Sequence, residues 1–315
     1  MASSAIIVFV VLVAIVLAAM FVFVRYRTRH AERDNPPVGQ FMEVDGVRLH
    51  YLERGQGQPI VLLHGNGSMI QDFDISGLVD LGAEHYRVIV FDRPGYGYSA
   101  RPRGGKPWDP KAQADLLHSA LQRLHVERPI VVGHSWGTLV AVSMALDYPA
   151  YVQSLVLLSG YYYPTVRFDV PMMSAPAIPV LGDIMRYTIS PLLGRIMWSG
   201  VLKIMFGPSA VPQRFERFPV WMVLRPKQLR ASAAESGLMI PAVFVLRRRY
   251  GELTMPVTIM AGADDQFVNS TRHSAQLQKE LPQSDLRLVP GVGHMIHQLV
   301  PHEVMTVIDS MTKAA

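Results

Sequence analysis

A serine with a glycine two positions to either side is the first candidate for chemistry in this chain. The motif Gly-His-Ser-Trp-Gly at residues 133–137 follows an apolar run at residues 130–132 and opens a stretch typical of a helix. In so tight a strand–turn–helix connection the flanking positions accept only small residues, and the serine hydroxyl is exposed. We therefore predict that Ser135 is a nucleophile set between Gly133 and Gly137. An ordinary helix N-cap is the alternative, but it explains neither glycine.

A serine hydroxyl is a weak nucleophile until a base takes its proton, and that base is commonly a histidine. Of the 11 histidines, His294 comes directly after the last expected strand and before a final helical stretch. Loops at the carboxyl ends of parallel strands gather the active groups of such a sheet. His297 and His302 fall on the following helical stretch, where we expect surface positions, and His134 should point away from its neighbour Ser135. We predict that His294 is the general base.

Two adjacent aspartates are candidates for the carboxylate that orients this histidine. Asp264 and Asp265 follow the apolar run at residues 257–260, in a loop on the same sheet edge. Either could fix the imidazole tautomer and stabilise the imidazolium. The alternative for each is an aspartate that caps a turn or a helix. The residue types alone do not separate the two.

A glycine-rich turn ends an earlier apolar strand and suits the binding of an oxyanion. This turn is His-Gly-Asn-Gly at residues 64–67. It can aim a backbone N–H group at negative charge that develops on a carbonyl oxygen. We expect the N–H groups of Asn66 and Trp136 to form the oxyanion hole, with His64 and Gly65 shaping the turn. The alternative is a plain loop.

Short apolar segments must hold these residues at one edge of a sheet. The expected strands are at residues 60–63, 87–91, 130–132, 154–158, 257–260 and 286–289. Helical stretches at residues 109–124, 137–147, 271–281 and 301–311 lie between or after them. A hairpin about Asp45-Gly46 precedes the first of these strands. The alternating order predicts an α/β fold with a parallel sheet covered by helices on both faces.

A long segment interrupts this alternation. Residues 160–255 hold 8 of the 17 methionines and carry 12 Lys and Arg against 5 Asp and Glu. We interpret the segment as a helical cap inserted into a core made of residues 40–159 and 256–315. The methionines suit a flexible acyl chain or fill the small core of the cap itself.

The N-terminal residues 5–24 form an unbroken apolar run without charge. Twenty residues of helix span about 30 Å, the hydrocarbon thickness of a bilayer. We predict an uncleaved transmembrane anchor rather than a cleaved signal peptide, because the run is too long and lacks a basic segment before it. A buried helix is the third alternative. A basic juxtamembrane linker at residues 25–39 follows, and the positive-inside rule places the catalytic domain in the cytoplasm.

The composition narrows the class of protein further. The chain of 315 residues has no cysteine, which excludes disulfides, thiolate metal sites and a cysteine nucleophile. Its formal net charge of +5 is modestly basic, but no nucleic-acid-binding motif accompanies it. A membrane surface is the better explanation of the charge. Nothing in the sequence calls for a cofactor or a metal.

Taken in order, these motifs resemble those of the lid-bearing α/β-hydrolase superfamily, in its serine hydrolase branch. The resemblance covers residues 40–313 and includes Asp-Arg-Pro-Gly-Tyr-Gly-Tyr-Ser at residues 92–99, a stretch that is structural in that family. It implies an eight-stranded, mostly parallel sheet, a triad in the chain order Ser, Asp, His, and a cap after the sixth strand. The family's acid falls three residues after the glycine that ends the strand, here Gly262, which favours Asp265 over Asp264.

We therefore expect a membrane-anchored serine hydrolase that cleaves a small-molecule carboxylic ester through an acyl-enzyme. C–C bond hydrolysis, amide or peptide cleavage, and acyl transfer use the same triad, so they remain alternatives. A ligand-binding protein with little turnover on this fold is a further alternative. The complete set of nucleophile, base, acid and oxyanion turn favours an enzyme.

Overall fold

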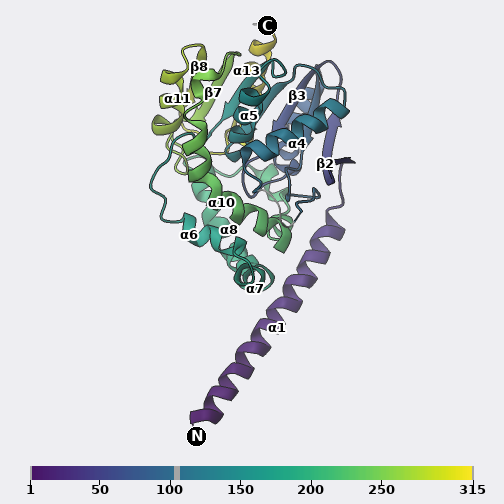
Figure 1. Ribbon diagram of the computed structural model, residues 1–315, viewed down its shortest axis with the longest axis vertical. Coiled ribbons are helices and arrows are strands. Elements are labelled where there is room, and N and C mark those ends of the chain that lie inside the picture. Colours follow the sequence, from purple (N-terminus) through teal and green to yellow (C-terminus); the bar gives the residue numbers. More distant parts are fainter. Residues whose placement is uncertain (1, 103–106, 314–315) are drawn as a thin grey trace.

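An eight-stranded sheet forms the centre of the computed structural model, which describes residues 2–102 and 107–313. The strands lie in the order β1-β2-β4-β3-β5-β6-β7-β8 (Figure 1). Their bounds are β1 Gln40–Val44, β2 Val47–Arg54, β3 Gln58–Leu63, β4 Tyr86–Phe91, β5 Ile130–His134, β6 Ser154–Leu158, β7 Val257–Gly262 and β8 Ser284–Val289. Strands β1 and β2 are antiparallel to their neighbours, and the other six are parallel. The predicted α/β fold class is confirmed.

Successive side chains of the central strands belong alternately to two hydrophobic clusters, one on each face of the sheet. On β3, Val61 and Leu63 join one cluster, and Ile60 and Leu62 join the other. The first cluster packs beneath α4 Pro110–Arg123 and α5 Trp136–Asp147, and the second beneath α2 Ile70–Ser76, α3 Leu78–Ala83 and α13 Pro301–Lys313. Strands covered on both faces must be apolar on both, which explains their continuous hydrophobic sequences.

The chain between β6 and β7 is helical, and we call residues 160–255 the cap. Its α-helices are α6 Val170–Ser174, α7 Leu181–Tyr187, α8 Ile189–Phe206, α9 Val220–Val223 and α10 Pro226–Leu246. Single turns of 3₁₀-helix at η1 Ala175–Ala177, η2 Gln213–Arg217 and η3 Tyr250–Glu252 connect them. After β7 come a π-helical turn, η4 Thr271–Ala275, and α11 Gln276–Glu280, and α12 Ile296–Leu299 precedes α13.

Helix α1 Ala2–Asp34 leaves the globular part as a straight stalk (Figure 1). Its residues Ser4–Asp34 form a candidate membrane span. Helices α8 and α10 are also long and apolar enough, but α10 buries the carboxylate of Glu235 against the core. The segment at residues 25–39, which we expected to be a linker, is helical as far as Asp34, because nothing before Pro36 interrupts the helix.

The end of α1 packs against the cap. The ring of Phe21 lies 5.8 Å from that of Tyr187 on α7, and the ring of Phe23 lies 6.0 Å from that of Trp221 on α9. Closer to the core, Glu32 forms a 2.8 Å ion pair with Arg225. Helix α1 therefore packs side by side with the cap helices α7 and α9 at its C-terminal end.

Candidate active site

Ser135 occupies a strained turn between β5 and α5. Its φ of 52° and ψ of −119° lie in a region that residues with a side chain rarely adopt. The turn is possible because two glycines let the backbone close tightly. A Cβ on Gly133 would lie 2.6 Å from the carbonyl oxygen of Gly137, and one on Gly137 would lie 2.1 Å from the carbonyl oxygen of Leu63. The strained position leaves Ser135 partly exposed on the sheet edge, as a nucleophile requires.

His294 lies in the loop after β8, where it contacts Asp265 from the loop after β7. The distance between His294 Nδ1 and Asp265 Oδ2 is 2.7 Å, and both side chains are buried. The other oxygen of Asp265 accepts hydrogen bonds from the backbone N–H groups of Phe267 and Val268, at 2.8 and 2.9 Å. The carboxylate is therefore held in place from both sides and fixes the orientation of the imidazole.

The second nitrogen of this imidazole is buried and unpartnered. Within the described part of the chain, His294 Nε2 has no hydrogen-bond partner, and the hydroxyl of Ser135 does not reach it with a hydrogen bond. The structure thus joins His294 to Asp265 and leaves His294 and Ser135 without a hydrogen bond between them. Catalytic hydrogen bonds that involve the nucleophile are often long in the absence of substrate.

The neighbouring aspartate, Asp264, makes a different contact. Asp264 Oδ2 accepts a 2.8 Å hydrogen bond from the backbone N–H of Gly291, and its side chain is exposed. This contact joins the loops after β7 and β8. The two aspartates, which residue types alone left equivalent, are therefore distinguished by geometry: only Asp265 contacts the imidazole of His294.

The turn at residues 64–67 packs directly against Ser135. A Cβ on Gly65 would lie 3.1 Å from the Cβ of Ser135. In the described residues, the backbone N–H groups of Asn66 and Trp136 donate no hydrogen bond, so both are free to bind an oxyanion. The side chain of Asn66 instead points to α10, where Nδ2 donates to the carbonyl of Ser232 and the hydroxyl of Ser236, each at 3.1 Å.

His64 supports this turn as a neutral imidazole. Its Nδ1 donates to the carbonyl of Gly65 at 2.8 Å, and its Nε2 accepts the backbone N–H of Arg93 at 3.1 Å. Complete burial, aided by the nearby Arg93 guanidinium, lowers the pKa of His64 to about 4. The ring therefore stays uncharged near neutral pH and keeps both hydrogen bonds.

A buried ion pair that the sequence analysis did not anticipate fastens the cap to the core. Arg93 donates two hydrogen bonds to the carboxylate of Glu235 on α10, at 2.6 and 3.0 Å. Tyr96 donates to the same carboxylate at 2.6 Å, and all three side chains are fully buried. Such a bidentate pair fixes both the distance between the two side chains and their relative orientation. The signal that could have revealed it is one acidic residue in an otherwise uncharged stretch at residues 231–246.

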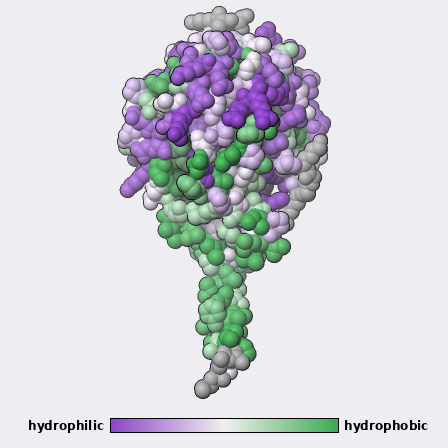
Figure 2. All heavy atoms as spheres, turned by 60° about the vertical axis from the view of Figure 1, so that its left-hand side comes forward, coloured by the Kyte–Doolittle hydropathy of each residue, from purple (hydrophilic) through white to green (hydrophobic). Residues whose placement is uncertain are grey.

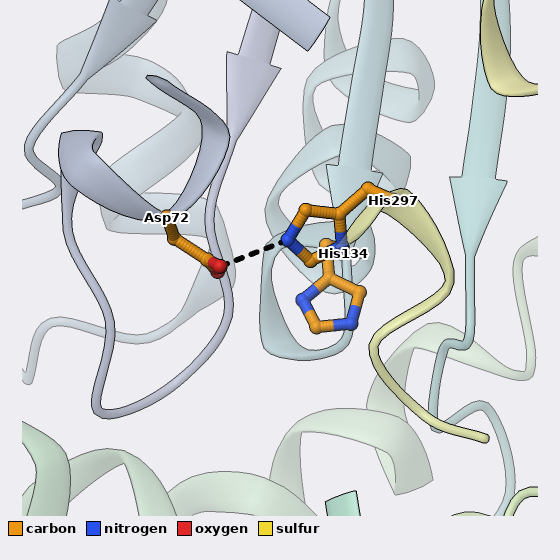
Figure 3. Close-up of side chains that lie close together, drawn as sticks. All are labelled: Asp72, His134 and His297. Carbon is orange, nitrogen blue, oxygen red and sulfur yellow. Dashed lines mark hydrogen bonds and ion pairs between the residues drawn. The ribbon is translucent and has the colours of Figure 1, made fainter. Parts of the chain in front are cut away.

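A second unanticipated cluster consists of Asp72, His134 and His297 (Figure 3). His297 Nε2 is 3.0 Å from Asp72 Oδ1, and His134 packs beside the His297 ring. His297 is fully buried, so its expected surface position is wrong: α12 turns inward and places it against α2. His302 is exposed, as expected. Burial, and after it the unfavourable electrostatic interaction with the neighbouring imidazoles, holds the pKa of His134 well below its ordinary value.

Ligand atoms of Asp72, His134 and His297 lie within 4.8 Å of one another, close enough for a metal ion. Hydrogen bonds already account for this arrangement, however. The Asp72 carboxylate accepts from His297, from Gln298 at 3.0 Å and from the hydroxyl of Ser68 at 2.9 Å. We therefore interpret the cluster as a buried support of the loop that carries His294, and we assign no metal to it.

Comparison with known proteins places this geometry in a family. A family model described as the alpha/beta hydrolase fold matches residues 58–299. An uncharacterized protein of Mycobacterium tuberculosis is 30% identical over 277 residues, which cover 82% of this chain and 76% of that protein.

Among solved structures, a membrane phospholipase A described as a bacterial virulence factor is similar over 99% of this chain and 98% of its own, with a TM-score of 0.66 and 20% identity. An esterase from Exiguobacterium antarcticum is similar over 87% of this chain and 100% of its own, with a TM-score of 0.66 and 22% identity. At these identities the two structures show the fold alone. The match to the family model, which spans most of the globular part, shows that this chain belongs to the α/β-hydrolase fold family.

Proposed function

We propose that this protein is a membrane-anchored serine hydrolase that cleaves the carboxylic ester of a small molecule. One observation carries the proposal: a buried imidazole with an aspartate on Nδ1, 2.7 Å away, and nothing on Nε2. A neutral imidazole bonded in this way has its proton on Nδ1 and its lone pair on Nε2. That is the tautomer that a general base needs.

The proposed reaction begins when Ser135 attacks the ester carbonyl carbon while His294 Nε2 takes the hydroxyl proton. Asp265 stabilises the imidazolium that results. The tetrahedral intermediate collapses, the alcohol leaves with the proton from His294, and an acyl group stays on Ser135. Water then attacks the acyl-enzyme with His294 again as the base, which releases the carboxylic acid and restores the serine.

Backbone N–H groups stabilise the negative oxygen of each tetrahedral intermediate. Those of Asn66 and Trp136 are unpartnered within the described chain. Trp136 also begins α5, so the positive end of the helix dipole adds to the stabilisation. Removing one such donor typically reduces kcat by about 10²–10³-fold.

An apolar ester is the substrate class that we favour. The cap holds 8 of the 17 methionines, whose side chains adapt their shape to flexible acyl chains. The esterase and the membrane phospholipase A among the similar structures support ester cleavage. We further propose that α1 is the single membrane anchor and that the arginines after residue 24 keep the catalytic domain in the cytoplasm.

Labelling with a fluorophosphonate probe tests the nucleophile. The full chain in detergent should be labelled at one site, and Ser135→Ala should abolish the labelling. The matched control is Ser174→Ala, which changes a partly exposed serine in the cap and should label as the wild type does. Labelling that survives Ser135→Ala would refute the assignment.

A series of p-nitrophenyl esters with increasing acyl length tests the chemistry. We expect hydrolysis with a preference for longer acyl chains, because the cap offers apolar side chains. A labelled serine that turns over no ester in this series would overturn the proposed ester specificity while leaving the nucleophile assignment intact.

A further inference from the structure

A basic cavity lies where the core, the cap and the anchor helix meet. It has a volume of about 340 Å³ and is lined by the cationic side chains of Arg101, Arg186, Lys227 and Arg230, with Tyr187 beside them. The described lining holds no carboxylate. A pocket of this size accommodates a small organic anion or the polar part of a larger molecule.

Three of these four cations form no ion pair within the described residues, although the carboxylate of Glu235 acts on Arg101, and those of Asp92 and Glu32 act on Lys227, at longer range. Arg186 is paired with Asp183, so its charge is balanced. Arg101 donates only a 3.4 Å hydrogen bond to the carbonyl of Ala231, and within residues 2–102 and 107–313 neither Lys227 nor Arg230 forms an ion pair. Partial desolvation and the nearby Arg225 lower the pKa of Lys227 to about 8. Four cationic side chains around a cavity whose described lining has no carboxylate favour the binding of an anion.

The start of α10 adds to this positive field. The helix is 21 residues long and begins at Pro226, which lines the cavity beside Lys227. Unpaired backbone N–H groups and the helix dipole make such an end favourable for phosphate groups. The cationic side chains and the N-terminus of α10 therefore both favour an anion in the cavity.

With α1 in a bilayer as proposed, the cavity lies near the depth where hydrocarbon changes to headgroups. Tyr187, which lines it, packs against Phe21 of α1 at 5.8 Å between ring centroids. Phe21 is near the end of the apolar run, four residues before Arg25, which corresponds to about 6 Å along the helix. Aromatic residues at the ends of spanning helices are typical of this interface.

The surface around the cavity is apolar as well. Apolar residues continue from the stalk of α1 onto the adjoining end of the globular part (Figure 2). Helices α7 and α8, which both contact α1, expose many large hydrophobic side chains there, and Ile196 is 75% exposed. The set includes Leu181, Ile184, Leu193, Ile196, Met197 and Val201. An extended exposed apolar surface next to a membrane span fits contact with lipid acyl chains.

We propose that this cavity binds the phosphate-bearing headgroup of an anionic lipid whose acyl chains lie along the exposed face of α7 and α8. Arg101, Lys227 and Arg230 contact the phosphate, and Tyr187 packs at the mouth. The inference rests on the membrane attachment included in the proposed function but not on its chemistry. The site binds lipid and is distinct from the serine that we propose to react.

Native mass spectrometry of the full chain in detergent micelles tests the site. The probes are ether-linked phosphatidylglycerol, ether-linked phosphatidylcholine and inorganic phosphate. Ether linkages prevent hydrolysis, so binding is measured independently of turnover. We expect phosphatidylglycerol to bind about tenfold more tightly than phosphatidylcholine, and phosphate to compete with it only weakly. Phosphate binding as tight as that of phosphatidylglycerol would show a site for a soluble anion and overturn the lipid assignment.

The variant Arg101→Gln/Lys227→Gln/Arg230→Gln should lose the preference for phosphatidylglycerol. The matched control is Arg247→Gln/Arg248→Gln/Lys279→Gln, which removes the same charge from exposed positions outside the cavity and should keep it. Fluorophosphonate labelling of both variants shows whether they are folded. If the triple cavity variant unfolds, Arg230→Gln alone serves as the test. A folded cavity variant that still prefers phosphatidylglycerol would overturn the proposal and leave the proposed hydrolase function standing.

Discussion

The imidazole of His134 donates a hydrogen bond from Nε2 to the backbone carbonyl of His294, 3.0 Å away and 160 positions later in the chain. The residue that precedes the proposed nucleophile therefore supports the backbone of the proposed base. This bond connects the end of β5 with the loop after β8 across the sheet edge. His134, which takes no direct part in the proposed chemistry, thus helps to hold the backbone of His294 next to the end of β5.

Exchanging the two neighbouring aspartates for asparagine should affect catalysis very differently. Asp265→Asn removes the charge that holds the tautomer of His294 and should reduce kcat by about 10⁴-fold. Asp264→Asn keeps an oxygen that can accept from Gly291 and should change kcat less than about tenfold. Steady-state hydrolysis of a p-nitrophenyl ester measures both. Equal losses in the two variants would contradict the assignment of Asp265.

Breaking the buried ion pair between core and cap should destabilise the fold. Glu235→Gln leaves the guanidinium of Arg93 buried without a counter-charge, which should cost about 3–5 kcal/mol of unfolding free energy. The control is Asp285→Ala, which breaks an exposed pair with Arg287 and should cost less than about 1 kcal/mol. Thermal unfolding in detergent compares them. Similar shifts in Tm for both variants would show that the buried pair contributes little.

Acid should destabilise the protein through its buried neutral histidines. Unfolded His64 takes up a proton below its ordinary pKa of 6.5, whereas the folded form resists protonation until about pH 4. The unfolded state therefore binds more protons in this window, and stability falls as pH drops from 6.5 to 4, by about 3 kcal/mol for His64.

The variant His64→Asn removes that titration while it retains polar atoms for the turn. We expect a lower Tm at pH 7 but a shallower decline of Tm between pH 6.5 and 4 than in the wild type. Parallel Tm curves for the two proteins would show that His64 is protonated equally in both states.

The contact between α10 and the oxyanion turn should influence turnover. Ser232→Ala/Ser236→Ala removes hydroxyl groups that bond to the side chain of Asn66. A looser turn holds its N–H less well against the developing oxyanion, so kcat should fall about tenfold with little change in KM. Ser174→Ala is the control. A change in KM alone would assign these serines to substrate binding instead.

The sheet and the loops at its edge were predictable because their signals are local. Strands buried on both faces produce continuous apolar runs, so the expected segment at residues 154–158 coincides with β6. Positive φ values at Asp45 and Gly46 agree with the hairpin that this pair predicts. The glycines on either side of Ser135 were likewise informative, because the backbone passes so close to each of them that a Cβ atom would clash.

Contacts between distant segments were not predictable, because each depends on how the whole chain packs. Nothing in the sequence near His297 indicates that α12 turns it toward Asp72. The partner of Glu235 lies 142 positions away in the core. The helical course of residues 25–34 is a similar case, since its contacts with the cap stabilise a segment that looks like a charged linker in isolation.

The unbroken course of α1 has a consequence for how the enzyme meets its surroundings. Ten helical residues from Arg25 to Asp34 rise only about 15 Å, and their far end is joined to the cap through Glu32. With α1 in a bilayer as proposed, the catalytic domain has a fixed height and can neither tumble nor turn its opposite side toward the lipid. Because α7, α8 and α9 contact α1, the side of the cap that these helices form then stays turned toward the bilayer.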